Sequence, residues 1–397
     1  MGRITRAESQ ERNRARVLAA ARDEFAGRGF RDAKIDDIAE RAGLTRGAVY
    51  SNFPGKRALF FSVLADAYRP DGDSGGEVAG AGGDVAGVLG AVARVWLDDP
   101  VPGSAMAVWR ELVPQVQADQ ASRSAFAQLM TLYATLLGLA MERLDAPPGR
   151  RLVRLATAAL TMLQGASQRA ALASGHAGDR STGHGRDPGH DHGWGEPGDA
   201  REDLVRACER LAGLDPGPAP LPPVLALEPY SLDGPWAPPA ATDALLGTPV
   251  DLGGDGLLLF LGLRRLSALE DAVRAAPAGL PVTLVVVTGD PGELGPLARF
   301  ALARMGAHLR AAVPPGAWPG VRVVCDESGR VAAAAGQPSV RDETESAVRI
   351  SAGRLVRRAD GRGAGFALAS ELAGDAGSRS TTARSGNPGA GAWGPAA

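Results

Sequence analysis

The stretch TRGAVYSNFPGK, residues 45–56, has the composition of a short helix that presents one end to another molecule. Thr45 is a favourable N-cap residue, and the residues after it keep the first turn polar and small. Tyr50 and Lys56 then place a hydroxyl and a cation at the far end, around a Pro-Gly break. A helix that only packs into a core needs neither feature.

The flanking residues predict two helices before this stretch and one after it. Apolar residues recur with helical period over residues 8–28 and 32–43, and helix resumes over 56–68. A helix, a tight turn at Gly43 and a short capped helix over 46–52 form the pattern of a helix-turn-helix. In that motif the second helix lies in the major groove of DNA, with its N-terminal residues on the base edges.

The side chains of the short helix suit such contacts. Arg46 can reach O6 and N7 of guanine. The small residue that follows lets the backbone approach the floor of the groove. The hydroxyls of Tyr50 and Ser51 can bond phosphates, as can Lys56 together with the free N–H groups of the next helix.

Residues 16–64 resemble the TetR (tetracycline-repressor-like) family of transcriptional regulators. They carry an A-x-x-x-F-x-x-x-G-F opening, an I-A-x-x-A-G-[LV]-[ST] core and a [LV]-Y-x-x-F-x-x-K ending. The family often has His or Tyr where this chain has Asn52. The resemblance implies that Arg46 and Gly47 face bases. It also implies that five residues hold the DNA backbone: Lys34, Thr45, Tyr50, Ser51 and Lys56.

Basic residues are concentrated at the N-terminal end of the chain. Residues 1–70 contain 14 Lys and Arg against 9 Asp and Glu, a net +5 in a chain of net charge −2, so the other residues carry −7. This asymmetry favours a polyanion as the partner of the N-terminal residues. Arg3 and Arg6 are candidates for an arm in the minor groove, with a solvated tail as the alternative.

The composition indicates a globular cytoplasmic protein without a membrane segment. Of the 397 residues, 45% are hydrophobic and 22% are charged, which suits a folded core. The apolar runs over 257–263 and 282–287 are too short to cross a bilayer. Cys208 and Cys325 form no CxxC motif, which argues against a disulfide framework or a cysteine-rich zinc site.

Residues 71–213 read as a series of amphipathic helices. The family resemblance implies an all-α domain here that binds a small-molecule effector and forms a homodimer. Its interface would be a four-helix bundle made by residues 149–173 and 200–213 of both copies. Dimerisation also has a physical reason, because two recognition helices spaced by about 34–36 Å, one turn of DNA, multiply the contacts of one.

Large apolar side chains of this region are candidates to line an effector pocket, with ordinary core packing as the alternative. They are Trp96, Met106, Trp109, Phe126, Met130, Tyr133 and Met141. Four of the five histidines fall in residues 175–199. Their density suits Zn, Ni or Cu, but the surrounding Gly, Asp, Pro and Ser favour a flexible loop over a metal site. We therefore expect no metal and no cofactor.

After a Pro-rich linker over 214–243, the pattern changes to strands that alternate with helices over 244–370. The expected strands are 256–262, 281–290, 321–327, 330–336 and 346–358, and the expected helices are 263–276 and 292–306. This order predicts an α/β domain. Residues 371–397 are expected to be disordered.

The α/β region resembles thioredoxin-like domains of the peroxiredoxin or thiol-disulfide-reductase type over 245–370. The resemblance rests on two segments, CDESGRVAAAAG (325–336) and AVRISAGRLVRR (347–358). The resemblance implies a cysteine after the first strand, but FLGLRRLSALEDA (260–272) has none. Because the thiolate is the nucleophile in that chemistry, we expect a redox-dead module for binding, with Cys325 as a small buried hydrophobe.

The sequence therefore predicts a dimeric DNA-binding transcriptional regulator that is not an enzyme. A repressor that leaves an inverted-repeat operator when an effector binds is the expected form. The alternative is that the main activity resides in the α/β domain, as a thiol-redox enzyme or as an interaction module. The missing cysteine weighs against the enzyme.

Overall fold

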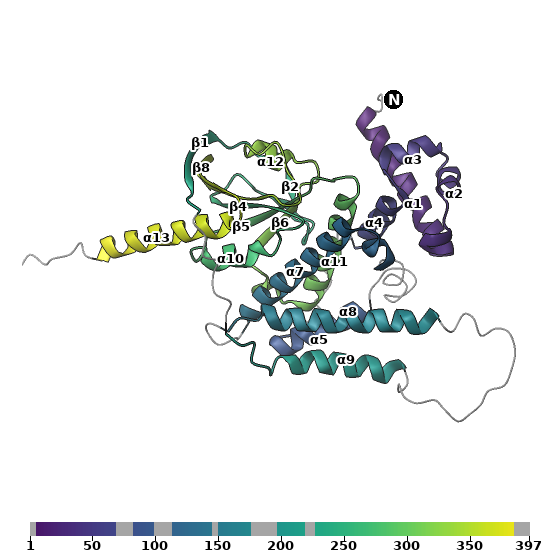
Figure 1. Ribbon diagram of the computed structural model, residues 1–397, viewed down its shortest axis with the longest axis horizontal. Coiled ribbons are helices and arrows are strands. Elements are labelled where there is room, and N and C mark those ends of the chain that lie inside the picture. The colour runs from purple at the N-terminus through teal and green to yellow at the C-terminus, as the bar shows by residue number, and fades with distance from the viewer. Residues whose placement is uncertain are drawn as a thin grey trace, which may run out of the picture.

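A computed structural model describes residues 5–68, 82–98, 113–144, 150–175, 197–218 and 227–384 of the chain. We call residues 5–68 the head, residues 82–218 the middle region and residues 227–384 the α/β domain. The head lies at one end of the molecule, the sheet at the other, and the long helices of the middle region run beneath both (Figure 1).

The head is a small bundle that contains the predicted helix-turn-helix. Its helices are α1 (Arg6–Asp32), α2 (Ile35–Arg41), α3 (Arg46–Asn52) and α4 (Lys56–Ala67). Gly43 has φ +61 in the turn between α2 and α3, a conformation that glycine adopts without strain. Gly29, with φ 72, kinks the end of α1. The turn at Gly43 occurs where the sequence predicted it.

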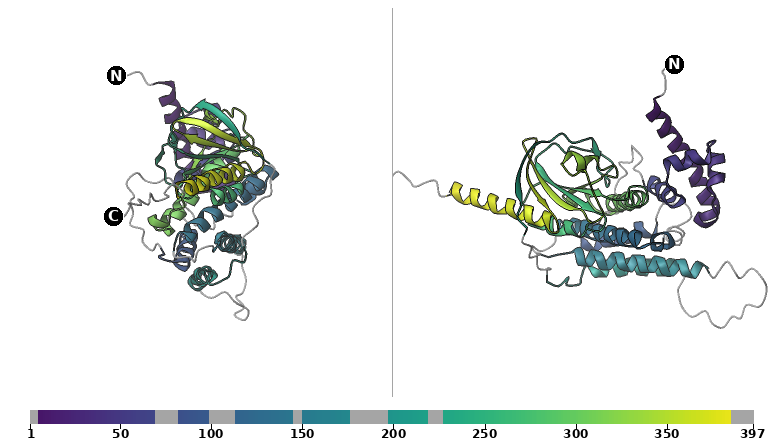
Figure 2. Two further views of the ribbon diagram at one scale, coloured as in Figure 1. Left: turned by 90° about the vertical axis from the view of Figure 1, so that its left-hand side faces the viewer. Right: turned by 45° about the horizontal axis from the view of Figure 1, so that its top comes forward.

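The middle region consists of long helices that pack in pairs. They are α5 (Val85–Leu97), α7 (Gln120–Glu142), α8 (Val153–Gly175) and α9 (Pro197–Leu211). Helix α5 packs on α9, and α7 packs on α8 (Figure 2). Among the described helices, α7 is the one with the length and hydropathy of a membrane span. Its most apolar window is 67% buried, as expected of a core helix.

The α/β domain is built on a six-stranded sheet of order β1-β8-β7-β4-β5-β6. Strands β4, β5 and β6 are parallel, and β7, β8 and β1 join antiparallel at one side. The strands are β1 (Tyr230–Pro235), β4 (Gly256–Gly262), β5 (Val282–Val287), β6 (Val321–Cys325), β7 (Glu345–Ser351) and β8 (Arg354–Asp360). A short pair, β2 (Ala241–Thr242) and β3 (Pro249–Val250), forms its own two-stranded sheet beside β6, where Asp243 bridges Val324.

Both faces of the sheet are covered, which explains the uninterrupted apolar run of β4. Leu257 and Leu259 belong to the large core that the sheet shares with its helices, and Leu258 and Phe260 belong to a second core on the opposite face. The helices are α10 (Ala268–Ala275), α11 (Leu294–Ala312), α12 (Arg330–Ala334) and α13 (Ala364–Arg384). The alternation of side chains along the strand thus separates two packed layers.

The predicted strand over 330–336 is wrong, because these residues form helix α12. The Asp326 carboxylate accepts hydrogen bonds from the backbone N–H groups of Arg330 and Ala332, both at 2.9 Å. A carboxylate that satisfies the free N–H groups of a first turn stabilises a helix start. The run of alanines then continues as helix, the conformation that alanine favours.

Two further segments are more ordered than the sequence suggested. The expected linker over 214–243 contains β1, which pairs with β8 and is fastened where the Tyr230 hydroxyl donates to Asp360 at 2.6 Å. The expected tail from 371 begins as helix, because α13 runs to Arg384. An ion pair of 2.5 Å between Arg357 and Glu371 ties α13 to the sheet.

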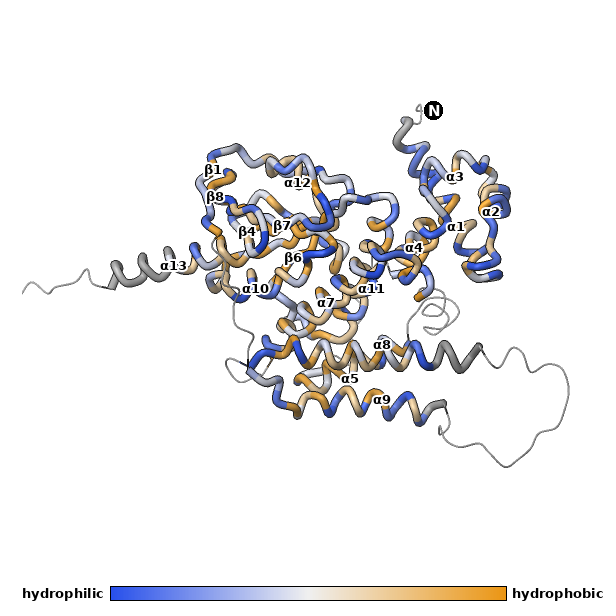
Figure 3. The backbone as a smooth tube through the Cα atoms, viewed as in Figure 1, coloured by the Kyte–Doolittle hydropathy of each residue, from blue (hydrophilic) through white to orange (hydrophobic). Residues whose placement is uncertain are grey.

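Helix α11 joins the α/β domain to the other two parts of the chain. It packs against α4 of the head and against α5 and α7 of the middle region. Phe300 on α11 stacks on Phe61 of α4, with 6.3 Å between ring centroids. One hydrophobic core therefore runs from the head through the middle region into the sheet (Figure 3).

A buried polar contact lies in the interface between α11 and α7. The Nδ1 atom of His308 and the Tyr133 hydroxyl are 3.1 Å apart, and His308 is fully buried. Burial and the neighbouring charge of Arg304 hold the pKa of His308 well below its usual value. His308 is therefore neutral near pH 7 in the folded chain.

We expect this histidine to make the interface sensitive to acid. Between the low folded-state pKa of His308 and its ordinary pKa near 6.5, the unfolded chain binds one more proton, so stability is lost as the pH falls. Urea unfolding should show a larger loss between about pH 7 and pH 5 for the wild-type chain than for His308→Gln. The same loss in both chains would contradict this assignment.

Candidate functional site

The helix α3 is capped and exposed as the sequence predicted. The Thr45 hydroxyl accepts a hydrogen bond from the N–H of Ala48 at 3.2 Å. Val49 is buried in the head, while Tyr50 is 40% exposed. Thr45, Arg46, Gly47 and Ser51 are also exposed. The predicted contact residues of this helix therefore form one open face.

Arg46 folds back onto the head. Its Nη1 lies 3.3 Å from both carboxylate oxygens of Asp36 on α2, and its guanidinium lies 5.5 Å from the ring centroid of Tyr50. The side chains of Arg46 and Asp36 are 61% and 64% exposed. Exposed ion pairs contribute little to stability, so Arg46 can exchange Asp36 for another acceptor at small cost.

Nothing in the described structure requires a glycine at position 47. A Cβ atom there would meet only the Thr45 hydroxyl, at 3.9 Å, and the backbone is in an ordinary helical conformation. Glycine in a helix costs about 0.5–1 kcal/mol relative to alanine. An alanine could therefore occupy this exposed first turn without a clash within the described chain.

The far end of α3 uses its polar side chains internally. The Ser51 hydroxyl and the Asn52 amide both donate to the Ala48 carbonyl, at 2.9 and 2.8 Å. The Ser51 hydroxyl oxygen remains able to accept or to reorient. Asn52, the residue that departs from the family pattern, is turned along its own helix.

The two lysines have different surroundings. Lys56 Nζ donates to the Arg31 carbonyl at 3.0 Å and lies 4.9 Å from the ring centroid of Phe30. It therefore packs against the end of α1 and keeps its charge beside the start of α4. Lys34 precedes α2 and is exposed.

Arg57, which the sequence reasoning missed, connects all three parts of the chain. It lies at the start of α4 and pairs with Asp119 at 2.6 Å and with Glu293 at 2.8 Å. Asp119 is the N-cap of α7, and Glu293 is the N-cap of α11. The hydrogen bond from Ser122 and the pair with Arg57 lower the pKa of Asp119 to about 2. No local signal marks this contact, because its partners are distant in sequence.

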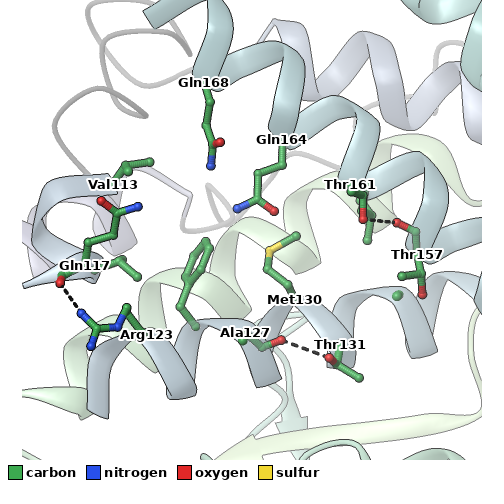
Figure 4. Close-up of a pocket in the computed structure, with 14 residues that line it drawn as sticks. Val113, Gln117, Arg123, Ala127, Met130, Thr131, Thr157, Thr161, Gln164 and Gln168 are labelled. Carbon is green, nitrogen blue, oxygen red and sulfur yellow. Dashed lines mark hydrogen bonds between the residues drawn. The ribbon is translucent and has the colours of Figure 1, made fainter. Parts of the chain in front are cut away.

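A pocket of about 410 Å³ lies between α7, α8 and residues 113–117. Its apolar part includes Phe126, Met130 and Leu160. Its polar part is formed by Gln117, Arg123, Thr131, Thr157, Thr161, Gln164 and Gln168 (Figure 4). Among the described residues that line it, Arg123 is the one with a charge, and it donates to the Gln117 carbonyl at 2.7 Å. We call this the α7–α8 pocket.

Two of the predicted ligand-lining residues, Phe126 and Met130, do lie in this pocket. Trp96 is fully buried elsewhere, where its indole N–H donates to the Ser167 hydroxyl at 3.0 Å. Tyr133 faces α11 and bonds His308, and Met141 is fully buried. Met106 and Trp109 lie outside the described residues. Sequence reasoning did not find the glutamines and threonines, which carry no signal apart from the fold.

The described residues offer no group of three or more metal-ligating side chains. The histidines of 175–199 lie in residues 176–196, outside the described part of the chain. Burial raises the pKa of the Cys208 thiol to about 11 and raises that of Cys325 further. Neither thiol is thus disposed to react as a thiolate at neutral pH.

Comparison with known proteins places the head in a family. Residues 17–63 match the family described as bacterial regulatory proteins, tetR family. The chain is 46% identical over 70 residues to the HTH-type transcriptional regulator SrpR of Pseudomonas putida. This match covers 18% of the chain and 32% of SrpR. It is also 46% identical over 70 residues to the uncharacterized HTH-type transcriptional regulator TtgW, likewise of Pseudomonas putida, covering 18% of the chain and 52% of TtgW.

The chain thus spans between a third and a half of the length of these relatives. A solved structure of RolR in complex with resorcinol aligns with 53% of this chain and 92% of its own, at 21% identity and a TM-score of 0.32. That TM-score is too low to indicate a shared overall fold. The family match lies over residues 17–63, so it describes the helix-turn-helix of the head and not the whole chain.

Because a side chain fits at position 47, the variant Gly47→Ala separates an effect on folding from an effect on DNA binding. Gly47→Ala should leave the free energy of unfolding unchanged or raise it by up to about 1 kcal/mol, because alanine favours helix. The same variant should bind DNA more weakly than the wild-type chain. Unfolding by urea and fluorescence anisotropy on duplex DNA measure the two effects. Unchanged DNA affinity would show that no close approach occurs at this position.

Proposed function

We propose that this chain, whose head is a TetR-family helix-turn-helix, is a cytoplasmic, dimeric, effector-responsive transcriptional regulator, and a repressor in its simplest form. The observation that carries the proposal is the exposed face of α3. On it, Arg46 contacts only exposed groups, the Asp36 carboxylate and the Tyr50 ring, and a Cβ atom at Gly47 would clash with nothing in the described chain.

In this proposal α3 enters the major groove. Arg46 leaves Asp36 and bonds guanine, and Gly47 lets the backbone approach the bases. Lys34, Thr45, Tyr50, Ser51 and Lys56 hold phosphates on either side. Moving Arg46 from Asp36 to DNA breaks an exposed ion pair, so the move is favourable only where an acceptor base replaces the carboxylate.

Dimerisation is proposed through α8 and α9, which correspond to the interface predicted over 149–173 and 200–213. Both helices present partly exposed apolar side chains, Met162 on α8 and Leu204 and Leu211 on α9. A Cβ atom at Gly165 would meet nothing within 4 Å, so another helix can approach there. Two heads related by a twofold axis would read an inverted repeat.

The α7–α8 pocket is proposed as the effector site. It combines an apolar wall with amides and hydroxyls, and its one charged lining residue is a cation. These groups suit a neutral or anionic organic molecule with an apolar body and several hydrogen-bonding atoms. A pocket of about 410 Å³ holds a molecule of drug size or smaller.

A series of contacts connects the α7–α8 pocket to the head. Helix α7 carries Phe126 and Met130 in the pocket and begins at the Asp119 cap, which pairs with Arg57 at the start of α4. An effector that binds more tightly when α7 is in one of two positions therefore also favours the corresponding position of α4. Such a bias is what a ligand needs to change DNA affinity.

For the α/β domain we propose a thioredoxin-like fold without redox chemistry. The order β8-β7-β4-β5 with α10 and α11 between parallel strands, and α13 after the hairpin, supports the fold. The segment after β4 has Arg264 and Arg265 and no cysteine. Without redox chemistry, the domain has a binding or a structural role. Its packing through α11 favours a role in holding the head in position.

The DNA-binding proposal is tested on sites selected from a random duplex pool. Arg46→Ala should weaken binding to the selected site by about tenfold to a hundredfold and leave random DNA nearly unchanged. Lys56→Ala should weaken both alike and lower the salt dependence by about one unit of slope. The matched control is Arg264→Ala, an exposed arginine of the α/β domain. Failure to enrich any sequence would contradict the proposal.

The effector site is tested by filling it. Ala127 is exposed and lines the α7–α8 pocket, so Ala127→Trp should occupy the space without disturbing the core. A compound that raises the Tm of the wild-type chain and releases operator DNA should do neither for Ala127→Trp. It should still act on Ala334→Trp, which places the same side chain on exposed α12. Equal responses of both variants would locate the effector elsewhere.

A further inference from the structure

A cleft of about 780 Å³ lies between the head and the α/β domain, separate from the α7–α8 pocket. We call it the head cleft. Helices α1 and α4 form one wall, and α11 with residues 239–248 and 324–331 forms the other. The cleft exists only because α11 holds the two parts together, so a ligand here touches both.

Four arginines line the head cleft: Arg14 from α1, Arg299 and Arg310 from α11, and the exposed Arg330 from α12. Arg14 donates a long bond of 3.5 Å to the Asn52 carbonyl and lies 4.5 Å from the ring centroid of Phe53. Arg310 donates to the Leu245 carbonyl. Within the described chain, neither has a carboxylate at ion-pair distance, whereas Arg299 pairs with Glu327.

The charge of the two arginines is only partly offset by the chain. Burial, and for Arg14 also the neighbouring charge of Arg299, lowers the pKa of Arg14 and of Arg310. A lowered pKa means that the charged form lacks some of the stabilisation it has in water. An anion in the cleft would supply it.

Most carboxylates of the head cleft are already engaged by the protein. Asp66 pairs with Arg22, and Glu327 pairs with Arg299. Asp326 accepts from the first turn of α12, and Asp243 accepts from the N–H groups of Leu245 and Leu246 at 2.8 and 3.1 Å. Glu11, exposed at the rim on α1, has no such bond among the described residues.

We propose that the head cleft binds a small organic or inorganic anion, a carboxylate or phosphate compound, between Arg14 of the head and Arg310 of the α/β domain. Guanidinium groups suit both classes of anion, since they donate two parallel hydrogen bonds to either. The cleft volume accommodates a molecule larger than the ion itself. This site is distinct from the effector site proposed above.

Binding there would reach the recognition helix directly. Arg14 contacts the last residue of α3 through the Asn52 carbonyl and the residue after it through the ring of Phe53. An anion that engages Arg14 and Arg310 together links the end of α3 to α11. The occupied cleft therefore favours one orientation of the head, and this consequence for DNA rests on the proposed function, whereas the binding itself does not.

The binding is tested on the full chain by thermal unfolding with sodium citrate or sodium phosphate, against sodium chloride at equal ionic strength. We expect a saturable rise of Tm of about 2–4 °C for at least one of the two anions. Arg14→Gln and Arg310→Gln should abolish the rise. The matched control Arg12→Gln, an exposed arginine on the same helix, should retain it. Glu11→Gln should reach saturation at a lower anion concentration, because it removes a repelling charge.

The outcomes separate cleanly. A rise that is not saturable, or that is equal in Arg14→Gln and Arg12→Gln, is the general stabilisation that these salts give to proteins and would overturn the proposal. Citrate alone or phosphate alone acting on the wild-type chain identifies the class of anion. Because no DNA is present, failure here leaves the DNA-binding proposal intact, and a failure of DNA binding leaves this one intact.

Discussion

The burial of helix α11 on two sides is the constraint on which the rest of the structure depends. Helix α11 contributes to the core that it shares with strands β4, β5 and β6, and it packs on α4, α5 and α7. Gly306 shows how tight this packing is, because a Cβ atom there would lie 2.3 Å from the Leu245 carbonyl oxygen. A helix that is apolar on most of its circumference must be enclosed. Here the enclosure brings the head, the middle region and the sheet into one core.

In this arrangement the α/β domain, as well as the middle region, contacts the head close to α3. In the head, α4 packs on α11, and Arg57 at the start of α4 bonds the N-cap residues of both α7 and α11. Pro54, in the turn after α3, also lies against Gly292, where a Cβ atom would meet the proline ring at 3.3 Å. The α/β domain is thus built into the support of the head and is not merely appended to the chain.

How much of this was predictable depends on the range of the interactions. The head was predicted nearly helix by helix, because caps, turns and apolar period are local signals: Thr45 caps α3, and Gly43 makes the turn. The strands β4 and β5 were predicted from uninterrupted apolar runs. Helix α12 was missed because its cap, Asp326, was read as the end of a strand, and β1 was missed because an edge strand among prolines has no alternation to detect.

The candidate site divides in the same way. Arg46, Gly47 and Tyr50 were identified from the motif, and the structure adds the Asp36 contact of Arg46. The Arg57 bridge, the glutamines of the α7–α8 pocket and the arginines of the head cleft depend on residues that are distant in the chain, which periodicity cannot pair. Trp96 was a candidate for a ligand pocket, with core packing as the alternative. The structure places it in the core, which large aromatic residues fill as readily as they line cavities.

The central claim is that two copies of α3, held by this shared core, lie in successive major grooves on one side of a DNA duplex. Hydroxyl-radical footprinting of the dimer on its selected operator tests this directly. The account predicts two symmetric protected half-sites whose centres are separated by about 34–36 Å, or about 10–10.5 base pairs, or a multiple of it. Uniform cleavage along the duplex, or a single protected half-site at saturating protein, would contradict it.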